Sequence, residues 1–277
     1  MTIVLLTLRE AANRKVLTVG AIISVAFIAL FWLGFAVGFD RATGSGEEAF
    51  TQTLAATLMT VLGLYAVQFL AAFLAVLLSS GAIASEIDSG RLHAILARPL
   101  SRTSWLAQRA GTYAGLAVIY IVVMSVAILL IAGGIAGYGA LDPPRAVGLL
   151  ALEVLVLVAV GTALSTRLSA IAAGVVVIAL YGAAWIAGIM EIVGNALDNT
   201  TLERIGVAVS LVIPSDALWR GASYYLQSPA FLAAQSGDVG IPFAGQAAPS
   251  AAFLAWSVAY AVAAGLLARR WFTRRDL

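Results

Sequence analysis

The chain has 277 residues, of which 62% are hydrophobic and only 11% are charged, and its formal net charge is +2. Soluble domains carry about a quarter charged residues, so this composition indicates an all-α integral membrane protein with no length left for a separate soluble catalytic domain. The sequence contains no cysteine, which excludes disulfides, thiolate metal sites and cysteine nucleophiles.

Residues 1–15 are the polar, positively charged start of the chain. In a helical frame Leu5 and Leu8 lie on one face, while Glu10 and Arg14 are four residues apart on another, where they can pair. Two structures fit this pattern: an amphipathic helix along the inner membrane interface, or simply the charged start of the first span. The apolar run that follows is too long for the core of a cleaved signal peptide, so we expect a retained span.

Six apolar runs are long enough to cross about 30 Å of hydrocarbon as helices. An acidic, glycine-bearing loop, Asp40–Glu48, follows the first run, and Asp142-Pro143-Pro144 is a firm helix stop after the third. The sequence therefore predicts a single transmembrane domain of six spans, at residues 16–38, 54–83, 105–138, 145–166, 170–190 and 250–268.

The charged residues divide unevenly between the two faces that six spans define. One face holds both termini and the segment between spans two and three, with twelve of the sixteen Lys and Arg residues against four acids. The positive-inside rule places that face, and both termini, in the cytoplasm. The segment between spans five and six, residues 191–249, is then the larger extracytoplasmic segment, in which we expect Ser215 to cap a helix with Asp216 in its first turn.

Residues 84–104 are the charge-dense interior of the chain. Each charge would cost on the order of 3 kcal/mol or more in hydrocarbon, so this segment must leave the bilayer. An apolar stripe at helical spacing over residues 92–96 predicts a short helix. The residues that could couple this segment to a partner are Glu86, Asp88, Gly90, Arg91, Arg98, Pro99 and Arg102.

The end of this cytoplasmic helix and the start of span three are also predicted. Pro99 ends the short helix, and Ser101 or Thr103 caps the next one. We expect Glu86 to pair with an arginine of the segment 82–109, which would hold span two against the start of span three. On the residues alone, an ordinary basic cytoplasmic loop fits as well as a coupling element.

Glu153 lies inside an otherwise apolar span. A carboxylate in a membrane span faces protein or water rather than lipid, so Glu153 either lines a substrate path, where it would favour a cationic or polar group, or packs by bonding to a neighbouring span. Trp219, Tyr224 and Tyr225 have the amphipathic character of side chains at the membrane–water boundary, where they could form an extracytoplasmic gate or recruit a partner protein.

Motifs for catalysis are missing from the sequence. It has no GxxxxGK[ST] loop to cradle phosphates, no HExxH, no GxSxG and no paired carboxylates on one span. We therefore expect neither an enzyme nor an ATPase, no catalytic residue, no metal site, and no cofactor bound by this chain.

The run from Ile83 to Arg102, IASEIDSGRLHAILARPLSR, resembles the permease subunits of ABC-2 type transporters. The six-span layout is similar throughout the chain, and it looks closest to the group that includes the maturation permease of nitrous oxide reductase operons. The residues that match the motif are Glu86, Gly90, Arg98, Pro99 and Arg102.

The resemblance implies a place and a set of partners. It implies an exporter subunit in the cytoplasmic (inner) membrane of a prokaryote that pairs with a second permease copy, forming a homodimer, and with two separate ATPase subunits that bind ATP and Mg. The N-terminal helix and residues 84–104 would touch the ATPase, and an extracytoplasmic accessory protein and the lipid bilayer are further partners, with no nucleic acid. A stand-alone secondary transporter or channel, and a membrane scaffold for assembly of another enzyme, are the alternatives.

Overall fold

A computed structural model describes residues 2–13, 15–44, 49–84, 86, 101–234 and 244–275. All regular secondary structure within these ranges is α-helical. Six of the helices are long and apolar enough to cross a membrane, which confirms the predicted number of spans. They are α2 (Lys15–Gly44), α3 (Ala49–Ser80), α6 (Arg102–Ala136), α7 (Pro143–Ser165), α8 (Ala170–Ala196) and α12 (Ala251–Thr273).

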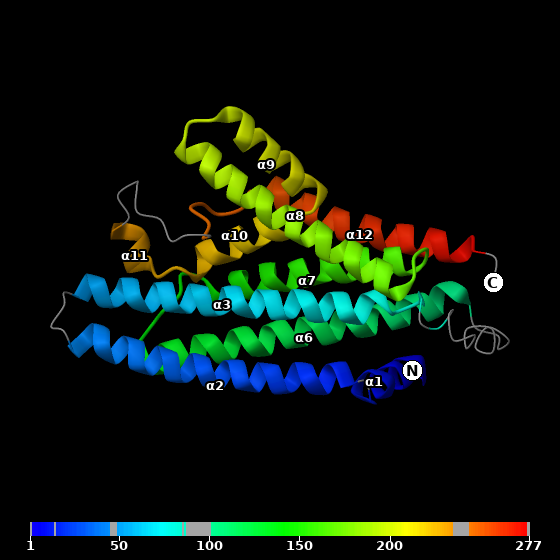
Figure 1. Ribbon diagram of the computed structural model, residues 1–277, viewed down its shortest axis with the longest axis horizontal. Coiled ribbons are helices and arrows are strands. Elements are labelled where there is room, and N and C mark those ends of the chain that lie inside the picture. Colours follow the sequence, from blue (N-terminus) through cyan, green and yellow to red (C-terminus); the bar gives the residue numbers. More distant parts are fainter. Residues whose placement is uncertain are drawn as a thin grey trace.

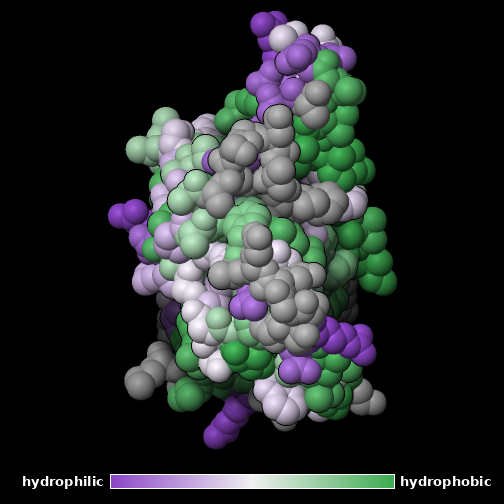
Figure 2. All heavy atoms as spheres, turned by 90° about the vertical axis from the view of Figure 1, so that its left-hand side faces the viewer, coloured by the Kyte–Doolittle hydropathy of each residue, from purple (hydrophilic) through white to green (hydrophobic). Residues whose placement is uncertain are grey.

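The four shorter helices are α1 (Thr2–Asn13), α9 (Thr200–Val212), α10 (Ser215–Leu226) and α11 (Pro229–Ala234). Both chain ends lie at the same end of the bundle, where α1 also lies (Figure 1). The helices α8 and α9 form a hairpin that leans away from the bundle, and α9 meets α10 at 100°, as a broken span or a re-entrant loop. Seen from the opposite end, hydrophilic side chains gather at the tip of the α8–α9 hairpin and hydrophobic ones along its flank (Figure 2).

Local sequence explains where several helices begin and end. The side chain of Ser101 accepts a hydrogen bond from the backbone of Ser104, which confirms that Ser101 caps the start of span three. That helix ends at Gly137, whose φ of 60° is a left-handed conformation that glycine adopts without strain. Asp142 caps α7 through the backbone of Arg145, so the predicted stop is also the start of the next helix.

Several helices extend beyond the predicted spans, two of them by six residues at their C-terminal ends. The first span extends six residues further, to Gly44, so that Asp40 and Arg41 lie in α2 rather than in a loop. The fifth extends to Ala196 and includes Glu191. Hydropathy marks where a helix leaves the hydrocarbon, whereas the helix itself continues until a residue with a different backbone preference ends it.

The segment 191–249 is more closely integrated than an external loop. The helix α10 packs against α7 in the bundle. It begins at Ser215 as expected, but Ser215 is not its cap: Pro214 holds that position and no side chain caps the helix.

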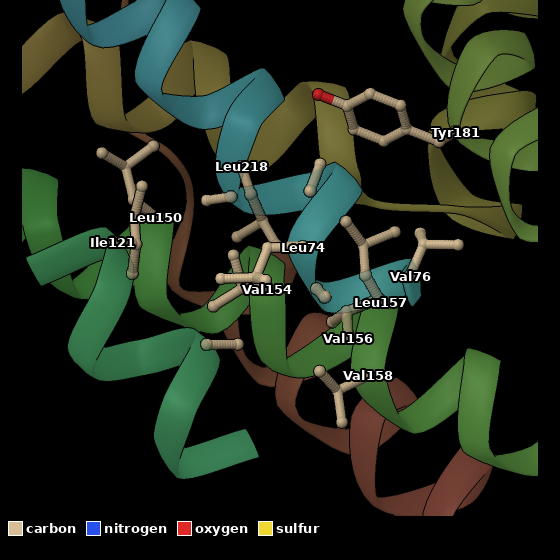
Figure 3. Packing of buried hydrophobic residues seen from close by; sticks show 14 of the residues in the cluster. Leu74, Val76, Ile121, Leu150, Val154, Val156, Leu157, Val158, Tyr181 and Leu218 are labelled. Carbon is tan, nitrogen blue, oxygen red and sulfur yellow. The ribbon is translucent and has the colours of Figure 1, made fainter. Parts of the chain in front are cut away.

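Burial divides the spans into inner and outer helices. The apolar windows of α3 and α7 are 56% and 61% buried inside the chain, whereas those of α2 and α12 are 11% buried. Aliphatic side chains of α3, α6 and α7 interdigitate between them (Figure 3). The helices α3 and α7 therefore form the centre of the bundle, and α2 and α12 present most of their surface to the outside of the chain.

Gly161 allows α7 to approach α3. A Cβ at this position would overlap the side chain of Ser79, which is fully buried. Replacing Gly161 with alanine should therefore lower the free energy of unfolding by about 1–3 kcal/mol, the usual cost of overpacking. Gly148→Ala on the same helix, where a new Cβ meets nothing within 4 Å, is the matched control and should leave stability equal or raise it. Thermal unfolding in detergent measures both, and equal midpoints would contradict the close packing.

Candidate functional site

A buried arginine joins three parts of the chain at the end of the bundle that carries both termini. Arg109 of α6 is 4% exposed, and its Nη2 donates to Oε1 of Glu86 at 2.9 Å and to Oε2 of Glu10 at 3.1 Å. Glu86 lies just beyond α3 and Glu10 belongs to α1. We call Glu10, Glu86 and Arg109 the arginine node. The expected pairing of Glu86 with an arginine of its own segment is present in the structure.

Glu10 is the member of the node that the sequence did not reveal. Its expected partner was Arg14, whose placement lies outside the described residues. A neighbour four residues away is visible in a sequence, whereas a partner on a different helix, 99 residues along the chain, is not.

Aromatic side chains shield the arginine node from water. The guanidinium carbon of Arg109 lies 5.4 Å from the ring centroid of Trp105 and 5.7 Å from that of Tyr113. Trp105 in turn stacks on Phe272 of α12 at 5.5 Å. All three rings are at most 1% exposed, so Arg109 and Glu86 interact in a medium of low dielectric constant, and the stacked rings link α6 to α12 beside the node.

A second set of contacts ties the C-terminal end of the chain to the same region. Arg102 Nη1 donates to the backbone oxygen of Arg275 at 3.0 Å, and Arg275 Nη1 donates to that of Thr166 at the end of α7. Arg102, a predicted coupling residue, thus lies at the start of α6 in contact with the end of α12. These contacts join the start of α6, the end of α7 and the residues that follow α12.

Most of the predicted coupling segment lies outside the described residues. This is so for Asp88, Gly90, Arg91, Arg98 and Pro99. The two predicted coupling residues that the structure describes, Glu86 and Arg102, stand on either side of that stretch, and the coupling helix itself stays a prediction.

Glu153 lies in the middle of the bundle, about 15 Å along α7 from its start at the rise of an α-helix. It is 1% exposed and accepts a hydrogen bond from Nε2 of Gln68 of α3 at 2.7 Å. The bond to a neighbouring span agrees with the packing interpretation, and a role in a substrate path stays a prediction. Gln68 is a polar residue within the apolar run of α3, and this was the sequence feature from which the partner of Glu153 could have been predicted.

A cluster of charges links α8 to α10. Arg220 Nη2 bonds to Oε2 of Glu191 at 2.6 Å, and its Nε lies 3.1 Å from Oδ2 of Asp216. Gly188 makes room for the cluster, because a Cβ there would overlap the Asp216 carboxylate. In the part of the chain that the structure describes, no group of three or more His, Cys, Asp or Glu side chains is placed to hold a metal ion.

The three aromatic residues predicted at the boundary fall into two environments. Trp219 is 1% exposed and packs on Tyr65 of α3, with ring centroids 4.9 Å apart, so it lies in the core and not at the membrane–water boundary. Tyr224 and Tyr225 are half-buried and contact each other, and Arg145 lies over the Tyr225 ring at 5.7 Å. The difference arises because α10 folds back onto α7, which turns one of its faces inward.

A cavity of about 710 Å³ lies between α2, α3 and α6. Its walls are apolar apart from the hydroxyls of Ser24 and Tyr120, which bond to each other at 2.7 Å. None of the residues that line the cavity is charged. The cavity is therefore separate from the polar sites described above.

Comparison with protein families gives one result. A family model described as ABC-2 family transporter protein matches residues 65–277. The matched region begins within α3 and includes Glu86, Arg109 and Glu153, whereas Glu10 lies before it. A search of curated proteins found no relative.

Proposed function

Because the chain belongs to the ABC-2 family of transporter proteins, and is a multi-pass membrane permease of that type, we propose that it is one half of an exporter driven by separate ATPase subunits. The partner subunits would bind and hydrolyse ATP with Mg. A second copy of this chain would complete the membrane domain as a homodimer. The narrower likeness to the nitrous oxide reductase maturation permeases is part of the proposal and not of the family assignment.

The arginine node is the observation that carries this proposal. An ATPase closes as a rigid body, and a permease that follows it needs a stiff element that receives the motion and passes it to the spans. The node joins α1, the end of α3 and the start of α6 through a single buried guanidinium. Glu86 and Arg102 flank the proposed coupling segment in the sequence, so a force on that segment would act on the node through Glu86 and the start of α6.

The N-terminal helix is suited to the same surface. Leu5 and Leu6 of α1 are 55% and 64% exposed, whereas Thr7 is 1% exposed. One face of α1 is thus buried against the bundle and another presents leucines outward, as a helix lying on the membrane surface requires. In the proposal α1 rests on the inner leaflet through these leucines, and Glu10 ties the helix to the arginine node.

Orientation follows from the distribution of basic residues. We propose that both termini and residues 84–104 face the cytoplasm of a prokaryotic cell, across its cytoplasmic membrane. Tyr224 and Tyr225 would then lie near the extracytoplasmic end, as a gate or as the contact for an accessory protein, and Glu153 would border the substrate path.

A single-cysteine labelling experiment tests this orientation, since the natural chain has no cysteine to remove. Thr273 lies at the exposed end of α12 and Leu141, which is 41% exposed, at the opposite end of the bundle. In intact cells a membrane-impermeant thiol reagent should label Leu141→Cys but not Thr273→Cys, and permeabilised cells should allow both. The reverse pattern would place the termini outside and contradict the proposal.

Affinity purification in mild detergent tests the function. The chain, purified from its native host, should bring along a soluble ABC ATPase that mass spectrometry identifies, at a ratio near one ATPase per permease copy. If the folded chain repeatedly carries no ATPase, the proposal fails and a stand-alone transporter or a scaffold becomes the better interpretation.

A further inference from the structure

Two hydrogen-bond acceptors are left over where α3 meets α7. The bond from Gln68 Nε2 to Glu153 Oε1 uses one oxygen of the carboxylate. Glu153 Oε2 and Gln68 Oε1 are both buried and have no hydrogen-bond partner among the described residues. The side chains are 1% and 4% exposed, so solvent does not satisfy them at the surface. Two buried acceptors on adjoining side chains need a hydrogen-bond donor, which either a proton on Glu153 or a bound N–H group can supply.

Aromatic rings line the same place. Tyr65 and Phe69 stand one turn apart on α3, on either side of Gln68, with ring centroids 5.0 Å apart. Tyr181 of α8 meets Phe69 edge-on at 5.7 Å, and Figure 3 shows its hydroxyl pointing from α8 toward α3. Aromatic faces attract cations, most strongly where water is excluded, and they do not attract anions.

The nearby charges favour a cation as well. Asp216 of α10 is 8% exposed and lies within electrostatic range of Glu153. Its Oδ2 faces Arg220 Nε as an ion pair at 3.1 Å but without hydrogen-bond geometry. Arg220 also forms an ion pair with Glu191 through Nη2. Among the described residues Arg220 is thus paired with Glu191 and Asp216, and Glu153 is not one of its ion-pair partners.

We propose that Glu153 and Gln68, together with Tyr65, Phe69 and Tyr181, form a binding site for an ammonium-type cationic group of the transported molecule. The N–H groups of such a cation would donate to Glu153 Oε2 and Gln68 Oε1, and its charge would rest against the carboxylate and the ring faces. The site deepens the proposed transport function by naming a substrate class. Because α3 carries Gln68 and leads to Glu86, motion at the arginine node would open and close this site.

Direct binding tests the inference without an ATPase. The purified full chain in lipid nanodiscs is titrated with dansylcadaverine, a fluorescent primary amine, and with its N-acetyl derivative, which lacks the charge. The wild type should bind the amine more tightly than the acetylated compound. Glu153→Gln keeps the size of the side chain and should weaken amine binding by about tenfold or more, as loss of a buried charge partner does.

Glu203→Gln is the matched control, since Glu203 is an exposed acid at the start of α9. It should leave the affinity for the amine unchanged, and thermal unfolding confirms that both variants are folded. Equal binding of the amine and its acetylated form, no binding of either, or unaltered binding by Glu153→Gln would each overturn the inference. The last result combined with a changed unfolding midpoint would assign Glu153 to packing, with its leftover oxygen satisfied by a proton.

The site rests on the proposed transport function, but the amine titration and the affinity purification can fail separately. A chain that binds the amine through Glu153 but carries no ATPase in affinity purification would keep this site and lose the ABC exporter function. A chain that carries the ATPase but does not distinguish the amine from its acetylated form would do the reverse.

Discussion

Replacing Arg109 with methionine should lower the free energy of unfolding by about 3–5 kcal/mol, the cost of leaving a buried carboxylate without its cation. Glu86, which is 2% exposed, would lose the guanidinium that bonds to it at 2.9 Å. Methionine keeps the length and apolar contacts of the arginine stem against Trp105 and Tyr113, so the loss is mainly one of charge. Unfolding in detergent, followed by circular dichroism, measures the change.

Two further variants separate charge from packing at the arginine node. Glu10→Gln removes the charge of the partner whose side chain is 26% exposed. This change should lower the free energy of unfolding by no more than about 1 kcal/mol, because solvent screens the pair. The double variant Glu86→Leu/Arg109→Leu removes both buried charges and should recover most of the stability while losing ATP-driven transport. A single Arg109→Met variant as stable as the wild type would show that the node contributes nothing to the fold.

Replacing Trp219 with alanine should destabilise the chain by about 3–5 kcal/mol, as removal of a fully buried aromatic side chain does. Trp219 is 1% exposed and packs on Tyr65, so the variant would leave a cavity between α10 and α3. The midpoint of thermal unfolding measures the effect. Trp256→Ala is the comparison, because Trp256 is 43% exposed on α12 and should cost much less.

The same experiment distinguishes core packing from gating. If Trp219 formed an extracytoplasmic gate at the membrane surface, its removal would change transport while leaving the unfolding midpoint near that of the wild type. The burial of Trp219 predicts the opposite result: the unfolding midpoint falls strongly, and any loss of transport follows from this loss of stability.

Hydropathy alone predicted the spans because a bilayer requires about twenty consecutive apolar residues per helix and this requirement is local. Helix ends were predicted well where a capping side chain marks them, as at Ser101, and less well at Gly44 and Ala196, where the helix continues beyond the hydrocarbon. At both of these ends the last residues of the helix are partly polar. Polar residues there fit a loop as well as a helix that continues outside the hydrocarbon, so the sequence alone did not show where the helix ends.

The candidate sites divide in the same way. The pairing of Glu86 with an arginine of its own segment was predictable because Glu86 and Arg109 flank one charge-dense stretch, 23 residues apart. Glu10 and Gln68 were missed because each meets its partner across helices that are 85 residues or more apart in the chain. Periodicity shows which face of a helix is polar, but which helix that face meets depends on how the whole bundle packs.

Site-specific photocrosslinking tests most directly whether an ATPase docks beside the arginine node. A photoreactive amino acid is placed at Ala107, an exposed position near the start of α6 at the end proposed to face the cytoplasm, and separately at Leu141 at the opposite end of the bundle. After irradiation of cells, the coupling mechanism predicts an adduct between the permease and an ABC ATPase from Ala107 and none from Leu141. An ATPase that is present in the complex but crosslinks only from Leu141, or equally from both positions, would contradict it.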